Sequence, residues 1–182
     1  MSAMDDLLAA YEARLKLPWD QSLAGAQRIW FVVYDPALER RLRLHLGDFE
    51  NATAQAGHGW RRIDLTDAFA DWMAAHKRRD AYFREPDKAK YALDQFASAL
   101  KERLLSAVND AGANDVVAVS GVAALFGLVR VSPLIGAVAG SVRGRLVVFF
   151  PGQYDERSYF RLLDARDGWD YLAVPITAGH PS

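Results

Sequence analysis

The sequence contains no cysteine, and its charges nearly cancel, with 22 Lys and Arg residues against 23 Asp and Glu residues. Disulfide bonds, thiol catalysis and zinc sites built on thiolates are therefore excluded. The net charge of −1 provides no general positive field to attract nucleic acid, although it leaves room for a local basic patch. The first ten residues hold two acidic side chains and no basic one. That is not the pattern of a signal peptide, so we expect a cytoplasmic protein.

Charge is scarce in one long stretch, because Val116 to Val142 holds a single charged residue, Arg130. The stretch is long enough to cross a bilayer, which requires about 20 residues. An arginine near its middle would cost about 2.5–3.5 kcal/mol on insertion, and Pro133 and four glycines interrupt the stretch. We therefore expect a buried strand, a turn and a short buried helix, and no membrane span.

Runs of apolar residues predict five strands. The run Ile29–Tyr34 is continuous and too short for a helix, as in central parallel strands that are buried on both faces. We expect the other strands at Trp60–Leu65, Val116–Val119, Leu146–Phe150 and Tyr171–Ile176. The last of these holds Pro175, which favours the edge of the sheet.

Helices are predicted between most of these strands by apolar residues spaced at i, i+3 and i+4. We expect them at Leu7–Leu15, after Asp35-Pro36, after Thr66, from Pro86 to about Asn109 and over residues 159–163. Asp35 and Thr66 are the expected N-caps of two of them. This alternation predicts one domain over residues 1–182, an α/β three-layer sandwich with a mainly parallel five-stranded sheet.

The carboxyl ends of parallel strands are where ligands bind in open α/β sheets. Asp35, Asp64, Ser120 and the segment Pro151–Asp155 follow four of the predicted strands. The carboxylates of Asp35, Asp64 and Asp155 could together hold Mg²⁺. Each also has a structural interpretation: a helix cap for Asp35, a turn or cap for Asp64, and a solvent-facing loop for Asp155.

Motifs for the common catalytic machineries are absent. There is no Gly-x-x-x-x-Gly-Lys-Ser/Thr loop, and the first strand leads instead into an aspartate, which would repel phosphate at a helix N-terminus. Ser120 lacks the Gly-x-Ser-x-Gly elbow of hydrolases, and the four histidines have no metal-ligand spacing. The sequence therefore predicts no catalytic set, no metal site and no cofactor.

Arg130 is the unusual charge, because an arginine in so apolar a segment must reach water, a carboxylate or several carbonyls. It is either a structural anchor or a recognition residue beside a predicted turn at Pro151-Gly152, which is followed by the aromatic Tyr154. Arg143 and Arg145 flank the fourth strand and are expected to be solvated.

A basic run could instead contact nucleic acid. It comprises Lys77, Arg78, Arg79 and Arg84, with the aromatic Tyr82 among them. The same run is also typical of a solvated helix end, where the helix dipole favours positive charge.

Several segments of the C-terminal third resemble the BrxB family of bacterial BREX phage-defence systems. They are Ser120-Gly-Val-Ala, Phe126-Gly-Leu-Val-Arg130, Leu134-Ile135, Leu146-Val-Val-Phe-Phe-Pro-Gly-Gln-Tyr-Asp155 and Phe160-Arg-Leu-Leu. Ser120 and Ala123 stand where the family has Thr and Gly, so the chain resembles a divergent member.

The resemblance implies a small cytoplasmic accessory protein without established catalytic residues, in a fold resembling a degenerate P-loop NTPase that lacks the Walker A motif. It implies assembly with other BREX proteins, first the PglZ-like phosphatase-family protein and then the large ATPase. Arg130, Pro151, Gly152 and Tyr154 would shape the contact surface. Two alternatives stay open: a metal-dependent phosphoester hydrolase at the strand ends, and a nucleic-acid-binding module at the basic run.

Overall fold

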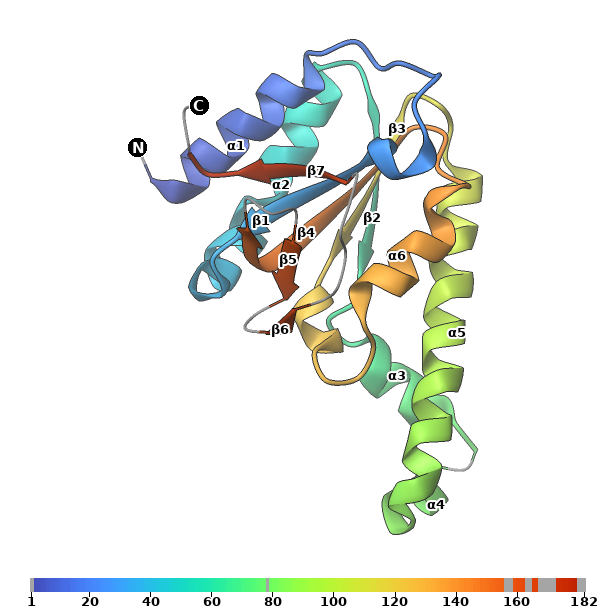
Figure 1. Ribbon diagram of the computed structural model, residues 1–182. Coiled ribbons are helices and arrows are strands. Elements are labelled where there is room, and N and C mark those ends of the chain that lie inside the picture. Colours follow the sequence, from blue (N-terminus) through green and yellow to red (C-terminus); the bar gives the residue numbers. More distant parts are fainter. Residues whose placement is uncertain (1, 78, 156–158, 163–164, 167–172, 180–182) are drawn as a thin grey trace.

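The computed structural model describes residues 2–77, 79–155, 159–162, 165–166 and 173–179 (Figure 1). The described helices are α1 (Ala3–Leu15), α2 (Glu39–Gln55), α3 (Ala68–Ala75), α4 (Arg79–Arg84), α5 (Pro86–Asp110) and α6 (Val131–Ala139). The described strands are β1 (Ile29–Tyr34), β2 (Gly59–Asp64), β3 (Asp115–Ser120), β4 (Arg145–Asp155), β5 (Tyr159–Leu162), β6 (Ala165–Arg166) and β7 (Val174–Thr177). Short 3-10 turns are η1 (Gly25–Arg28), η2 (Pro36–Leu38) and η3 (Val122–Leu125).

Five strands form a parallel sheet in the order β2-β3-β4-β1-β7. Since these strands run in the same direction, their carboxyl ends share one edge of the sheet and their amino ends share the opposite edge. Beyond the carboxyl edge β4 continues and pairs antiparallel with β5, which in turn pairs with β6. The sheet therefore has two chemically separate ends, and each holds a cavity described below.

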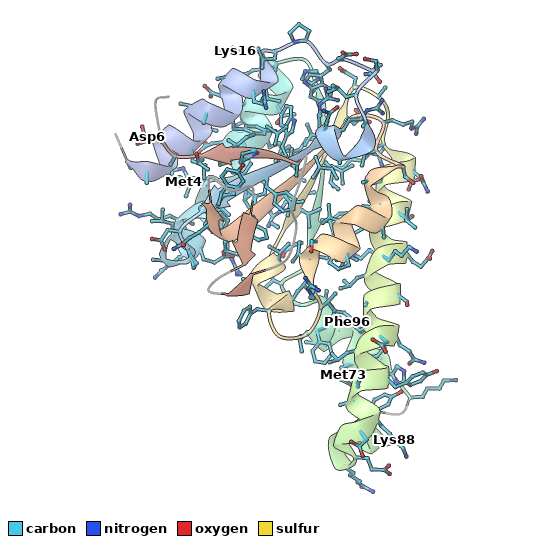
Figure 2. The ribbon with its side chains drawn as sticks, in the orientation of Figure 1. Met4, Asp6, Lys16, Met73, Lys88 and Phe96 are labelled. Carbon is cyan, nitrogen blue, oxygen red and sulfur yellow. The ribbon has the colours of Figure 1, made fainter. Side chains whose placement is uncertain are left out.

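The core has two halves because side chains alternate between the faces of the sheet. Phe31 and its neighbours on one face pack under α3, α5 and α6, whereas Trp30 and its neighbours on the other face pack under α1 and α2. Met4 and Phe96 are buried on these opposite faces, while Lys16 and Lys88 are exposed (Figure 2). Helices thus cover both faces, which confirms the predicted three-layer α/β sandwich (Figure 1).

Local signals in the sequence explain several element boundaries. The helix α1 begins with a capping box in which the side chains of Ser2 and Asp5 each accept a backbone hydrogen bond from the other residue. Every residue of β1 is buried, as its continuous apolar run predicted. The strand β7 lies at one edge of the sheet and contains Pro175, as predicted. Tyr171, the predicted start of that strand, lies outside the described residues.

Two predictions near the C-terminus are wrong. Residues 159–162 form β5 and not a helix, because they close an antiparallel hairpin on β4. Pro151 and Gly152 lie within β4 and not in a turn. Pro151 stands opposite Tyr34 in the last pair with β1, where β3 has already stopped pairing after Val148. A proline without an N–H is tolerated there because the strand has lost one neighbour.

The predicted helix cap at Thr66 is also wrong. The helix α3 begins after Asp67, whose side chain makes no capping hydrogen bond. The hydroxyl of Thr66 instead donates to Asp64 Oδ1 at 2.6 Å.

The stretch from Val116 to Val142, which has a single charge, forms most of β3, then η3 and α6. This confirms the predicted strand, turn and short helix. In the part of the chain that the structure describes, no helix combines the length and the hydropathy needed to cross a membrane.

Candidate functional site

A cavity of about 800 Å³ opens at the carboxyl edge of the sheet. It is lined by Ala3, Leu7, Val33, Tyr34, Asp35, Pro36, Leu38, Gly152, Gln153, Tyr154, Thr177 and Ala178. These residues come from the start of α1, from η2, and from the C-terminal ends of β1, β4 and β7 with the residues next to them. Of the predicted site residues, Asp35, Gly152 and Tyr154 line this one cavity. Pro151, which precedes Gly152 in β4, is buried and does not line the cavity.

The carboxylate of Asp35 is engaged by its own turn. Its Oδ1 accepts a hydrogen bond of 2.8 Å from the backbone N–H of Ala37, with Pro36 at the first position of η2. This confirms the predicted cap. In nucleotide-binding folds, the free N–H groups at the start of the helix after the first strand bind a phosphate. In this chain the carboxylate of Asp35 takes up one of those N–H groups instead.

Tyr34 supplies the buried polar group of this cavity. Its hydroxyl donates to the carboxylate of Glu39, which also accepts from Arg43 Nε at 3.1 Å. Burial, followed by the hydrogen bond and charge of Glu39, raises the pKa of Tyr34 well above its ordinary value. The phenol therefore stays protonated, and its proton is held by Glu39.

Asp64 and Ser120 meet at a second place on the same edge, because they are register partners at the ends of β2 and β3. Asp64 Oδ1 accepts from the backbone N–H of Thr66 at 2.9 Å, which confirms the turn interpretation, and from the Thr66 hydroxyl. Arg62 joins the pair, with Nη2 3.4 Å from Asp64 Oδ2 and Nε 3.4 Å from Ser120 Oγ.

This polar cluster keeps Asp64 ionised. Partial burial raises its pKa, but the hydrogen bonds from Thr66 and the charges of Arg62 and Arg43 outweigh that effect, so the pKa of Asp64 lies below its ordinary value. Its oxygens are satisfied within the chain. The cluster holds Asp64 in a structural turn.

Gly121 is required by the same cluster. It adopts a left-handed conformation with φ of +78°, and a Cβ there would lie 2.5 Å from Thr66 N and 2.7 Å from Asp64 Oδ1. The Ser120-Gly121 pair therefore lets the loop after β3 pass close to the loop after β2.

Metal binding by Asp35, Asp64 and Asp155 finds no support in this arrangement. Asp35 and Asp64 are turned onto different local backbone N–H groups. The side chain of Asp155 lies outside the described residues. Among the side chains that the structure does describe, no group of three His, Cys, Asp or Glu residues is placed to hold a metal ion.

Arg130 lies elsewhere. It stands at the start of α6, is exposed to solvent, and lines a cavity of about 350 Å³ between α5 and α6 together with Asp94 and Lys101. None of the residues that line this cavity also lines the carboxyl-edge cavity. The two cavities therefore have separate linings, and the interpretation of Arg130 as an anchor or a recognition residue beside Pro151-Gly152 stays a prediction.

The basic run lies near the N-terminal end of α5, where α3 and α4 contact that helix (Figure 1). Lys77 and Arg84 are exposed, Arg78 lies outside the described residues, and the side chain of Arg79 is not described. Tyr82 is buried, with 8% of its surface exposed, so it offers no free ring for a base to stack on.

Arg143 and Arg145 were predicted to be solvated. Arg143 is exposed, as predicted, whereas the prediction is wrong for Arg145. Arg143 Nη2 donates to the carbonyls of Asn109 and Ala111 at 2.8 and 2.7 Å, at the C-terminal end of α5. Arg145 is buried, with 3% of its surface exposed, at the amino edge of the sheet.

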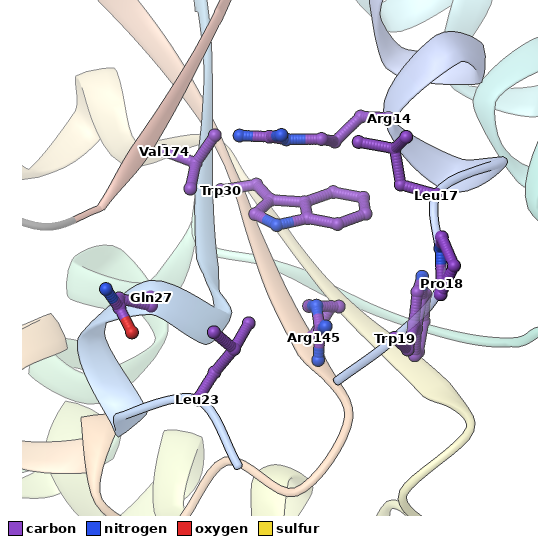
Figure 3. Close-up of a pocket in the computed structure, with 9 residues that line it drawn as sticks. All are labelled: Arg14, Leu17, Pro18, Trp19, Leu23, Gln27, Trp30, Arg145 and Val174. Atoms are coloured by element: carbon purple, nitrogen blue, oxygen red, sulfur yellow. The ribbon is translucent and has the colours of Figure 1, made fainter. Parts of the chain in front are cut away.

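The surroundings of Arg145 form a third cavity, of about 290 Å³, at the amino edge (Figure 3). Its guanidinium carbon lies 4.8 Å from the ring centre of Trp19 and 5.8 Å from that of Trp30. Trp19 is in turn stacked on His58, with ring centres 3.6 Å apart. Burial, and then the charges of Arg28 and Arg14, lower the pKa of Arg145, although Asp20 opposes them.

The sequence analysis did not predict this pocket, because it considered only residues at the carboxyl ends of the strands. Strand pairing could have indicated it. In a parallel sheet the start of β4 lies beside the start of β1, and here Ile29 is opposite Leu146. Alternation along both strands then turns Arg145 and Trp30 to the same face.

Comparisons with known proteins identify the family of this chain. Neither the curated proteins nor the solved structures contain a match to this chain. A protein-family model described as "BREX protein BrxB" matches residues 62–176, which includes every segment quoted above for the resemblance. The match covers more than half of the chain, from β2 through most of β7. The chain therefore belongs to the BrxB family, and with it to the components associated with BREX defence.

Proposed function

We propose that this protein is a non-catalytic component of a BREX antiphage system that acts in the cytoplasm by binding other proteins of that system. The carboxyl-edge cavity is the proposed contact surface. The PglZ-like phosphatase-family protein is the first candidate partner, and the large ATPase is the second.

One observation carries the proposal: the polar side chains at the carboxyl edge already have hydrogen-bond partners within the chain. Asp35 caps η2, Asp64 holds Thr66, and the hydroxyl of Tyr34 is held by Glu39. General acid–base chemistry needs a titratable group that can reach a substrate proton, and these groups already have partners. What the edge offers instead is a hollow of about 800 Å³ with many apolar and aromatic walls.

Such a hollow suits an inserted side chain of another protein. Interface anchors are typically aromatic or aliphatic side chains that fill a pocket, and the surrounding rim contributes little energy. Leu7, Val33, Leu38 and Ala178 supply the apolar wall, and Thr177 and Gln153 supply an exposed polar rim.

The test is a pull-down with two matched variants on the same helix. Ala3 and Ala9 are both exposed residues of α1, but Ala3 lines the cavity whereas Ala9 does not. Ala3→Trp should fill the cavity and abolish capture of a BREX partner. Ala9→Trp should leave capture unchanged, because it adds the same bulk away from the cavity.

Both variants must first show the thermal unfolding midpoint of the wild-type protein. If no BREX protein, PglZ included, is captured by the wild-type chain, the proposed function is wrong. If Ala3→Trp captures the partner as well as Ala9→Trp does, the partner uses another surface.

The nucleic-acid alternative receives no support from the basic run, since Tyr82 is buried there and the exposed Asp80 sits among the basic residues. Filter binding at rising salt would decide it, because phosphate contacts weaken steeply as salt increases.

A further inference from the structure

Three buried side-chain nitrogens of the described residues have no hydrogen-bond partner: Trp19 Nε1, Arg28 Nε and Arg145 Nε. All three are donors, and all belong to the amino edge of the sheet or the loop before it. Buried donors in folded proteins nearly always have an acceptor. The amino edge therefore holds three buried donors that have no acceptor among the described residues.

Arg145 is the centre of this imbalance. Within the described part of the chain its guanidinium makes one hydrogen bond, from Nη1 to the carbonyl of Gly144 at 2.9 Å, and no carboxylate lies within salt-bridge distance. The carboxylate of Asp20 accepts instead from Ser22 N at 2.8 Å. A buried charge is normally paired, since desolvation disfavours it strongly.

The guanidinium faces a pocket that has mostly apolar walls. Leu17, Pro18, Leu23 and Val174 line it together with the two indoles, and Arg14 and Gln27 are its other polar residues (Figure 3). Leu17 is 51% exposed, so the rim of the pocket reaches solvent. The rings of Trp19 and Trp30 hold the guanidinium in place before anything binds.

We propose that this pocket binds a carboxylate group carried on a compact apolar body. A guanidinium matches the planar geometry of a carboxylate with two parallel N–H donors. One buried guanidinium suits a single negative charge, and indole faces with aliphatic walls suit the apolar body. The carboxylate belongs either to a free small molecule or to a partner protein.

The probe is sodium benzoate, titrated into the full-length protein with sodium chloride at equal ionic strength as reference. Binding to the folded state raises the thermal midpoint, so the wild-type midpoint should rise with benzoate and not with chloride. Isothermal titration calorimetry then gives the Kd.

Arg145→Met should weaken benzoate binding by at least about tenfold, as the loss of a charge-assisted hydrogen bond predicts. Its midpoint without benzoate should equal or exceed that of the wild type, because an apolar chain of similar length replaces an unpaired buried charge. Leu23→Trp, which fills the pocket and keeps the charge, should also lose the response. The exposed Arg41→Met on α2 is the control and should respond as the wild type does.

The proposal fails if wild-type protein ignores benzoate at tens of millimolar, or if Arg145→Met binds it as well as the wild type. A lower midpoint of Arg145→Met without benzoate would mean that the guanidinium already has a partner in the chain, which also overturns it. If inorganic phosphate raised the thermal midpoint as much as benzoate does, the pocket would not require an apolar body on its ligand, and that part of the proposal would be wrong.

The source of the carboxylate is decided by repeating the pull-down with saturating benzoate. Release of a captured partner assigns the carboxylate to that partner, and unchanged capture assigns it to a free molecule. The titrations use the protein alone, so they stand even if the proposed function fails.

Discussion

Gly121 allows a sharp test of how the two loops at the carboxyl edge are held together. Replacing it by alanine has two separable costs. A side chain in the left-handed conformation costs about 1–2 kcal/mol, and the new Cβ would lie 2.5 Å from Thr66 N and 2.6 Å from Thr66 Oγ1. Overpacking of this kind adds about 1–3 kcal/mol. We therefore expect Gly121→Ala to lower the free energy of unfolding by about 2–5 kcal/mol.

Gly127 is the matched control. It has a φ of +76°, almost the same conformation, but nothing lies within 4 Å of the position its Cβ would take. Gly127→Ala should therefore show the conformational cost alone, about 1–2 kcal/mol.

Urea unfolding followed by tryptophan fluorescence measures both variants. At about 2–4 °C per kcal/mol for a chain of this size, their thermal midpoints should differ by several degrees. Equal destabilisation of the two variants would show that the close approach of Gly121 to Thr66 does not exist in solution.

Two further predictions concern buried and exposed polar groups. Thr53 Oγ1 donates to a backbone carbonyl at 2.7 Å and lies 2.7 Å from the hydroxyl of buried Tyr11, so the tyrosine must donate to it. Thr53→Val should cost about 1–3 kcal/mol by leaving that donor unpaired, and adding Tyr11→Phe should recover part of the loss; a fully additive double mutant in urea unfolding would contradict this pairing. The folded-state pKa of Asp64 lies below its unfolded value, so its carboxylate contributes stability at neutral pH that is lost as the pH falls through the folded-state pKa. The wild type should therefore be more stable than Asp64→Asn at pH 7, and the difference should shrink as the pH falls below about 4 and vanish below the folded-state pKa. A gap that stays constant across the pH range in thermal unfolding would refute it.

The sheet was predictable because its information is local. A continuous apolar run such as Ile29–Tyr34 is typical of a strand buried between two layers, and Asp35-Pro36 is typical of a helix start. The sequence predicted Asp64 and Ser120 as separate strand-end residues and did not predict that they are neighbours. Their pairing followed only from the parallel register of β2 and β3.

The two wrong predictions near the C-terminus share a cause, which is that tertiary strand pairing overrode a local signal. A Pro-Gly dipeptide usually marks a turn, but Pro151-Gly152 stays extended because β1 and then β5 supply its partners. The short apolar segment at 159–162 has no marked helical or strand period, and only its pairing with β4 makes it a strand.

Arg143 and Arg145 show the limit most clearly, since the sequence presents them as equivalent charges beside a strand. Gly144 between them passes so close to β3 that a Cβ there would lie 2.1 Å from the carbonyl oxygen of Asp115. The chain can turn at that point only without a side chain, and the turn sends the two guanidiniums to different places. Arg143 reaches two carbonyls at the end of α5, which satisfies it. Arg145 starts β4 and is directed between Trp19 and Trp30, where the aromatic faces hold a cation in position but cannot accept its N–H groups as an anion would. A buried guanidinium that lies against two indoles and has no carboxylate partner is the observation on which the proposed carboxylate pocket at the amino edge rests.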